Sequence, residues 1–134
     1  MIKDIHPPKV EDIAVAVIKE KNDLQETIWN VYLLNLKDTK IEGVLVNSTG
    51  YGIHNEEEVK TSTLRHFLDV VAGGSYRKIE PMPENLFGLN NEYWVSFFIG
   101  NVMYDKKFIF LAETIREDYF TLVPLINKKG VMIK

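Results

Sequence analysis

The sequence predicts a mainly β protein, a two-layer antiparallel β-sandwich. Two pairs of apolar-rich stretches lead to this prediction, residues 27–36 with 41–48 and residues 93–104 with 107–115. Each stretch is rich in Val, Ile, Leu or aromatic residues, and a few polar residues join the members of each pair, which is typical of β-hairpins. We expect about eight or nine strands and at most one short helix.

The N-terminal part of the chain is expected to begin with extended backbone. Pro7 and Pro8 fix their own φ angles and restrict the preceding residues, and a strand over residues 10–20 follows. The next strand, over residues 25–36, is apolar on both of its faces. An antiparallel strand of this kind usually lies in the middle of a sheet, where a second layer or a partner chain covers the other face.

A third strand is expected over residues 41–48. The segment 49–52 contains two glycines, and the acidic run 56–58 follows, so we expect a turn and then a loop here. Residues 61–72 fit both helical spacing and alternation. Several Thr and Val residues in that segment are poor helix formers, so a strand is preferred.

Further strands are expected along the C-terminal half. After a strand over residues 76–80, residues 84–91 form a loop that contains one helical turn. The long stretch 93–104 is expected to be one strand with a bulge at Gly100, closed by a turn at residues 105–106.

The last strands are expected over residues 107–115, 119–126 and 131–133. A turn at residues 127–130, which have the sequence Asn-Lys-Lys-Gly, is expected to join the last two.

So many short strands, each with an apolar face, must close around a common core, either as a sandwich or as a barrel. The sandwich is favoured by residues 72–80, in which two glycines open a strand. This passage resembles, in architecture only, the corner at which immunoglobulin-like and fibronectin-like sandwiches cross between sheets. The length of 134 residues predicts a single domain over residues 1–134.

Composition excludes several classes of protein. Hydrophobic residues make up 46% and charged residues 26%, which is ordinary for a globular chain. There is no cysteine, hence no disulfide framework and no thiolate chemistry, and a cytoplasmic location is expected. The first twenty residues contain no signal-peptide core, and no stretch is long and apolar enough for a membrane helix. A net charge of −3 with scattered Lys and Arg disfavours nucleic-acid binding.

Candidate ligand residues are few. They are charged, imidazole or aromatic side chains near the predicted turns and the middle strands: Tyr51, His54, Arg65, His66 and Arg77. An arginine pair on neighbouring strands can bind an anion, although cross-strand ion pairs explain such residues more simply. The glycine loop before Tyr51 lacks the lysine of a phosphate-binding loop.

Catalytic and metal-binding interpretations have weak support from the sequence. His54 precedes three glutamates but has no second histidine nearby, so a plain acidic loop is preferred to a metal site. Ser62, His66 and Asp69 are the residue types of a hydrolase triad, yet on a strand Asp69 points away from the other two. No catalytic residue, cofactor or metal is therefore predicted.

The remaining signal is surplus apolar surface, since both long hairpins are apolar on two faces while a small domain has one main interior. We therefore expect a non-enzymatic module that works through protein contacts, with itself as a homodimer or with another protein. The interface candidates are apolar side chains of the two long strands: Trp29, Val31, Leu33, Tyr93, Val95 and Phe97. The alternative is a small-ligand or metal-binding domain, or a hydrolase, that uses the loops around Tyr51, His54 and Arg65.

Overall fold

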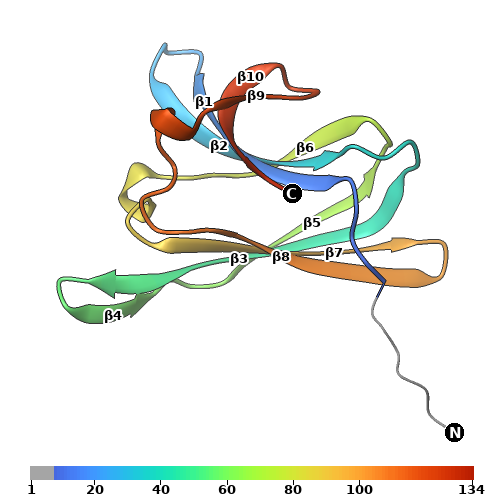
Figure 1. Ribbon diagram of the computed structural model, residues 1–134, viewed down its shortest axis with the longest axis horizontal. Helices are drawn as coiled ribbons and strands as arrows, with labels where there is room; N and C mark the ends of the chain where they lie inside the picture. The colour runs from blue at the N-terminus through green and yellow to red at the C-terminus, as the bar shows by residue number, and fades with distance from the viewer. Residues whose placement is uncertain (1–7) are drawn as a thin grey trace, which may run out of the picture.

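A computed structural model, which describes residues 8–134, consists of two antiparallel five-stranded sheets packed face to face (Figure 1). Sheet A contains, in spatial order, β6 (Ser75–Pro81), β2 (Thr27–Asn35), β1 (Ile13–Lys21), β10 (Lys128–Ile133) and β9 (Thr121–Val123). Sheet B contains β4 (Glu57–Lys60), β3 (Ile41–His54), β7 (Asn90–Ile99) and β8 (Val102–Phe110), while β5 (Leu64–Val71) pairs with β3. The predicted fold class, a mainly β antiparallel sandwich, is confirmed.

Helical structure in residues 8–134 is confined to two short 3-10 turns. They are η1 (Glu84–Leu86), between β6 and β7, and η2 (Glu117–Tyr119), between β8 and β9. The helical turn expected within residues 84–91 is thus confirmed. The immunoglobulin-like and fibronectin-like likeness stays a prediction.

The main core lies between the sheets, because alternate residues of each strand point inward. Sheet A contributes Val15, Val17, Val31 and Leu33, all with no exposed surface. Sheet B contributes a matching set from β3, β7 and β8: Val44, Val46, Tyr93, Val95, Phe97, Phe108 and Phe110. Burial of these large side chains is the dominant favourable term in the folding of a sandwich.

Strand 61–72 and the corner after it agree with the sequence prediction. The chain leaves sheet B at Val71 and enters sheet A at Ser75. Asn35, which is fully buried, stabilises this corner, since its Nδ2 donates to the carbonyls of Val71 (3.1 Å) and Ala72 (3.2 Å). At Gly73 a Cβ atom would lie 2.5 Å from the carbonyl of Asp38, so no larger residue fits at this crossing.

The hairpin predicted between residues 27–36 and 41–48 does not form, because β2 lies in sheet A and β3 lies in sheet B. Three predicted turns were also wrong, and glycine serves two different purposes in this chain. Residues 49–52 do not turn, and β3 continues to His54. Gly50 and Gly52 lie instead where the side chain of Leu89 approaches, 3.5 and 3.4 Å from the position of a Cβ. The true turn follows at Asn55 and Glu56, which both have positive φ angles, as a two-residue type I′ hairpin requires. The acidic run predicted to be a loop therefore enters β4.

The second wrong turn is the one at residues 105–106, which lie inside β8. The chain reverses at Gly100 and Asn101, because Ile99 pairs with Val102 and Gly100 has φ +60. A positive φ at the first turn residue is what a type II′ hairpin needs. Hence residues 93–104 are the two arms of one hairpin.

The third wrong turn is the one at residues 127–130, because β10 begins at Lys128. The reversal spans residues 124–127, and Gly130 pairs with Ile18 in the sheet. A Cβ at Gly130 would lie 2.3 Å from the carbonyl oxygen of Val17. The predicted strands 107–115 and 119–126 are correspondingly shorter, since β8 ends at Phe110 and β9 covers three residues.

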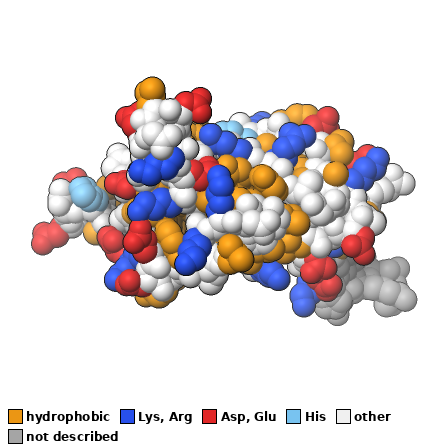
Figure 2. Space-filling model, turned by 90° about the horizontal axis from the view of Figure 1, so that it is seen from above, with side chains coloured by type: hydrophobic (Ala, Val, Ile, Leu, Met, Phe, Trp, Pro, Cys, Tyr) orange, Lys and Arg blue, Asp and Glu red, His pale blue; other side chains and the backbone are white. Residues whose placement is uncertain are grey.

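The outer face of sheet A carries a second apolar cluster. Its buried members come from β1, β2 and β9: Ala14, Ala16, Ile18, Leu34 and Val123. Half-buried side chains of the β9–β10 segment, Leu125, Ile126 and Met132, pack against them together with Tyr32 and Leu36. Figure 2 shows this face, with apolar side chains gathered near its middle and Lys and Arg around them. The second apolar face of residues 27–36 is thus covered within the chain.

We predict that Gly73→Ala destabilises the protein by about 2–3 kcal/mol, because its Cβ overlaps backbone atoms that cannot move aside. Gly100→Ala is the matched control, since the space around Gly100 is open and only its positive φ opposes alanine, at a cost of about 1 kcal/mol. Urea unfolding of both variants measures this difference. Equal losses of stability would contradict the close packing of the corner.

Candidate functional site

The outer face of sheet B is built from β5, β3, β7 and β8. Residues that pair directly across antiparallel strands share a face, so the pairing defines rows of side chains. The first row consists of Arg65, Asn47, Trp94 and Lys107. The second consists of Phe67, Leu45, Ser96 and Asp105, and the third of Glu42, Phe98 and Met103.

Large apolar side chains on this face are open to solvent. Phe67 is 67% exposed, and Trp94, Phe98 and Met103 are exposed as well. Phe98 lies over Gly43, whose missing side chain leaves room for the ring. Single exposed apolar residues are ordinary, whereas neighbouring ones on one sheet face are typical of an interaction surface.

A groove of about 430 Å³ lies at the Trp94 end of this face. It is lined by polar and aromatic side chains: Asn47, Thr49, Tyr51, Lys60, Thr63, Glu92 and Trp94. The Nζ atom of Lys107 lies 4.6 Å from the Trp94 ring centroid, a cation–π distance. Asn47 Oδ1 is buried and accepts no hydrogen bond within the described part of the chain.

The five candidate ligand residues do not converge on one pocket. Tyr51 lines the groove, whereas His54 is exposed at the β3–β4 turn. Arg65 lies on the outer face of sheet B. Arg77, on β6, donates to the carbonyl of Val70 at 3.0 Å and so ties the two sheets together at their edge. Only His66 takes part in a buried polar cluster.

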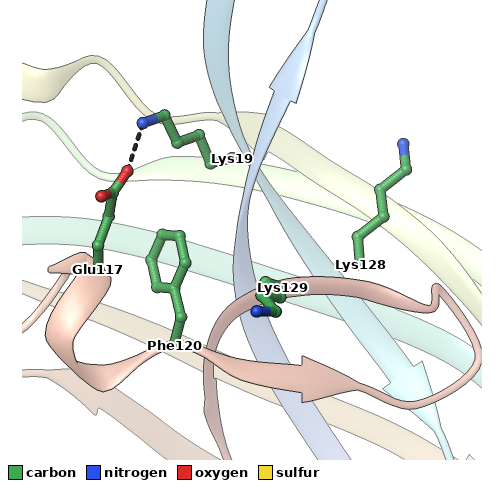
Figure 3. A pocket seen from close by; sticks show the side chains of 5 residues that line it. All are labelled: Lys19, Glu117, Phe120, Lys128 and Lys129. Carbon is green, nitrogen blue, oxygen red and sulfur yellow. Dashed lines mark hydrogen bonds and ion pairs between the residues drawn. The ribbon is translucent and has the colours of Figure 1, made fainter.

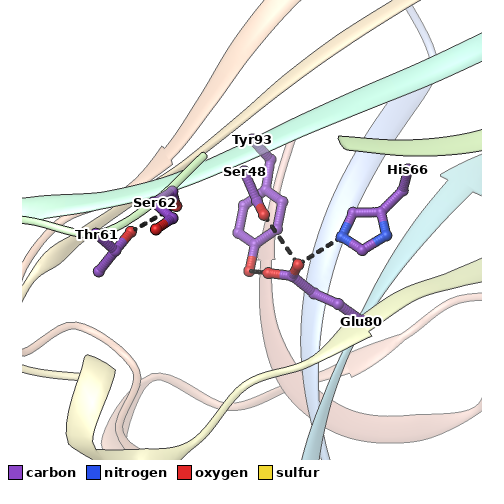
Figure 4. A network of polar contacts seen from close by, with 6 residues as sticks. All are labelled: Ser48, Thr61, Ser62, His66, Glu80 and Tyr93. Atoms are coloured by element: carbon purple, nitrogen blue, oxygen red, sulfur yellow. Dashed lines mark hydrogen bonds and ion pairs between the residues drawn. The ribbon is translucent and has the colours of Figure 1, made fainter. Parts of the chain in front are cut away.

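That cluster is centred on Glu80, whose carboxylate reaches from β6 of sheet A to three strands of sheet B (Figure 4). Ser48 Oγ donates to Oε1 at 2.9 Å, and the Tyr93 hydroxyl donates to Oε2 at 2.9 Å. His66 Nε2 also lies 2.7 Å from Oε1, and since an ionised carboxylate can only accept, the imidazole donates. One acidic side chain therefore bridges the two layers.

The cluster is not a hydrolase triad. Ser48 and His66 both bond to the same carboxylate oxygen and not to each other, so the imidazole is not placed to take a proton from the hydroxyl. Ser62 and Asp69 do not belong to it; the carbonyl of Ser62 accepts from Thr61. Glu80 was not among the site residues predicted from the sequence. The one local indication was its position directly after an apolar residue, Ile79, which is buried.

Burial raises the pKa of Tyr93 far above its ordinary value of 10.0, and the adjacent negative charge of Glu80 raises it further. The hydroxyl therefore stays protonated and donates to Glu80 across the physiological range of pH. Because Tyr93 is nearly fully buried, this hydrogen bond is protected from competing water.

The six interface candidates are all buried in this structure, and their side chains belong to the core between the sheets. Trp29, for example, packs edge-to-face against Phe87 and Phe120. The predicted alternation of side chains along β7 is correct. Trp94 and Phe98 lie on one face of the sheet, and Tyr93, Val95 and Phe97 lie on the other. The face selected for a partner is, however, the one that faces the opposite sheet.

A large open pocket near the C-terminal strands, of about 630 Å³, contains three lysines (Figure 3). Lys19 is paired with Glu117, and Lys128 is paired with Glu20 at 2.9 Å. Burial alone would raise the pKa of Glu20, but the hydrogen bonds from Asn30, Lys128 and Tyr32 outweigh it and lower that pKa. Two of the three lysines already have acidic partners, which weakens the pocket as an anion site.

Within residues 8–134 no group of three or more His, Asp or Glu side chains is arranged to hold a metal ion. No helix in that range is long and apolar enough to cross a membrane. Comparison with known protein families, with curated proteins and with solved structures finds no significant match to this chain.

We predict that Tyr93→Phe lowers the free energy of unfolding at neutral pH by about 1.5–3 kcal/mol, because a buried hydrogen bond to a charged group is lost. Tyr119→Phe, at an exposed site on η2, is the control and should change little.

The loss of unfolding free energy caused by Tyr93→Phe should also depend on pH. The pKa of Tyr93 is raised in the folded chain, so its contribution is complete below about pH 10 and declines as the pH rises further. The difference between wild type and Tyr93→Phe should therefore narrow above about pH 10 in urea unfolding experiments. A difference that stays constant there would contradict the assigned cause.

Proposed function

We propose that this chain is a non-enzymatic interaction module that pairs with a second copy of itself through the outer face of sheet B. The proposal rests on the exposed apolar side chains of Phe67, Trp94, Phe98 and Met103 on that face. Face-to-face packing of sheets is already how this chain buries its inner surfaces, and two copies can repeat it.

The charges of this face fit a second copy. Arg65 and Lys107 lie in one row, and Glu42 and Asp105 lie in the two rows beyond it. A twofold axis that lies between the faces and runs across the strands sets the row of Arg65 and Lys107 in one copy opposite the row of Glu42 in the other, and it sets Asp105 opposite its own counterpart, which is one like-charge contact per dimer. An axis along the strands would instead set Arg65 against Lys107, which like-charge repulsion disfavours.

The same arrangement suits the apolar side chains. It sets Trp94 opposite Phe98, while Leu45 and Phe67 each face their own counterparts. Aromatic side chains at the centre with charges at the rim are the usual composition of a specific interface. A stable dimer of standard size needs about 800 Å² from each partner, so strands beside the apolar rows would also take part.

We place this module in the cytoplasm, a reducing compartment with which a chain free of cysteine is compatible. Pairing would cover the remaining apolar face, which would otherwise be a liability for aggregation.

We predict that wild type forms a dimer whose population rises with protein concentration in light scattering, and that Phe67→Asp shifts it to monomer by about tenfold or more in dissociation constant. Phe67 is 67% exposed, so a charge there should leave the fold intact.

Leu122→Asp is the matched control, because Leu122 is 65% exposed but lies on β9 of sheet A. It should dimerise like wild type. A monomeric wild type, or equal effects of the two substitutions, would refute pairing through sheet B.

A further inference from the structure

A small cavity of about 180 Å³ lies beside the Glu80 carboxylate, between β3, β6, β7 and η1. Its lining combines the polar cluster with apolar side chains: Ser48, Thr49, Gly50, Thr61, Leu64, Glu80, Leu86, Asn91 and Tyr93. A space of this size holds about six waters, or one organic molecule slightly larger than benzene. It can therefore take a small ligand.

The hydrogen-bond donors around this cavity are already used. The hydroxyls of Ser48 and Tyr93 donate to Glu80. The hydroxyl of Thr61 donates to the carbonyl of Ser62 (3.0 Å), and the backbone N–H of Gly50 donates to Thr61 Oγ1 (2.8 Å). A ligand that needs donors from the protein finds none among these groups.

Acceptors remain free. Asn91 is only 4% exposed, and its Nδ2 donates to the carbonyls of Leu86 (2.9 Å) and Leu89 (3.1 Å). No hydrogen bond from the described residues reaches its Oδ1, which lies on the Gly50 side, 3.4 Å from where a Cβ on that glycine would be. This oxygen is therefore free to accept a hydrogen bond from a donor in the cavity.

The charge at the cavity is also incompletely balanced. The Glu80 side chain is 12% exposed, and no Lys or Arg of residues 8–134 forms an ion pair with it. Its one ion-pair partner is His66, which is a cation only when protonated. Hydroxyl donors stabilise a buried carboxylate but do not neutralise it, so a cationic ligand would gain from this field.

We propose that this cavity binds a small alkylammonium cation. The ammonium group carries donors only, and it faces Glu80 and Asn91 Oδ1, which can accept from it. The short alkyl chain packs against Leu64 and Leu86. Anions are repelled by the carboxylate, and neutral alcohols of the same size lack the charge. This binding site is separate from the dimer face, because Ser48 and Asn47 are consecutive in β3 and point to opposite sides of the sheet.

The test is a titration of the full chain with n-butylammonium chloride near neutral pH, followed through backbone amide NMR signals. We expect saturable shifts in the millimolar range, confined to residues 48–50, 61–64, 80, 86–91 and 93. The neutral isostere 1-butanol should bind about tenfold more weakly or worse. Absence of saturable shifts, or an equal response to 1-butanol, overturns the proposal.

Two variants test whether the charge of Glu80 is responsible for binding. Glu80→Gln keeps the shape and removes the charge, and should weaken butylammonium binding about tenfold or more. Glu58→Gln, which removes an exposed carboxylate from β4, should bind like wild type. Equal affinity of Glu80→Gln and wild type overturns the proposal.

If Glu80→Gln unfolds, Leu64→Trp replaces it, because Leu64 is half-exposed at the cavity and a larger side chain there would fill the space. It should abolish binding with the fold retained, and unchanged affinity overturns the proposal. Phe67→Asp should bind butylammonium like wild type, so failure of dimerisation and failure of ligand binding are read separately.

Discussion

Each sheet of this sandwich has apolar side chains on two faces, whereas the space between the sheets can bury only one face of each. The inner faces form the main core. On sheet A the second face is covered by the β9–β10 segment, whose Leu125 and Ile126 pack against the buried cluster from β1, β2 and β9. On sheet B no segment within residues 8–134 covers Phe67, Trp94 and Phe98 in this way. The asymmetry between the two outer faces is therefore the physical basis for proposing a partner on one of them.

The polar interior follows from the same geometry. Because β6 is an edge strand of sheet A, its Glu80 side chain can reach into the opposite sheet without crossing the apolar centre of the core. Three donors from β3, β5 and β7 then meet one carboxylate. The hydroxyls of Ser48 and Tyr93 donate to Glu80 and therefore cannot donate to a ligand. The adjoining cavity thus offers a ligand mainly hydrogen-bond acceptors.

Strand β3 connects these two features. Its residues alternate between the interior, where Ser48 and Gly50 line the cavity, and the exterior, where Asn47 and Tyr51 line the groove of the outer face. Pairing on both sides, with β7 along one edge and with β5 and β4 along the other, keeps this strand rigid. Two surfaces with different chemistry thus share one backbone, and a substitution on one need not disturb the other.

Local sequence patterns were enough to predict the fold class, the corner at Gly73 and the strands with two apolar faces, since all three depend on alternation of period two and on glycine next to an apolar run. It left open which apolar face is internal, because alternation is the same from either side. For this reason Val31 and Phe97 were assigned to a partner although they lie in the core. It also could not distinguish a glycine that turns, such as Gly100, from one that admits a close neighbour, such as Gly50.

The polar cluster was beyond local reasoning. Glu80, Ser48, His66 and Tyr93 come from four strands, and their convergence depends on strand order and inter-sheet packing. The sequence predicts His66 as a ligand candidate and Tyr93 as an interface candidate, and neither prediction indicates Glu80 as their common partner. Which side chains meet depends on how the two sheets pack, because contacts between distant strands follow from that packing and not from any pattern within one strand.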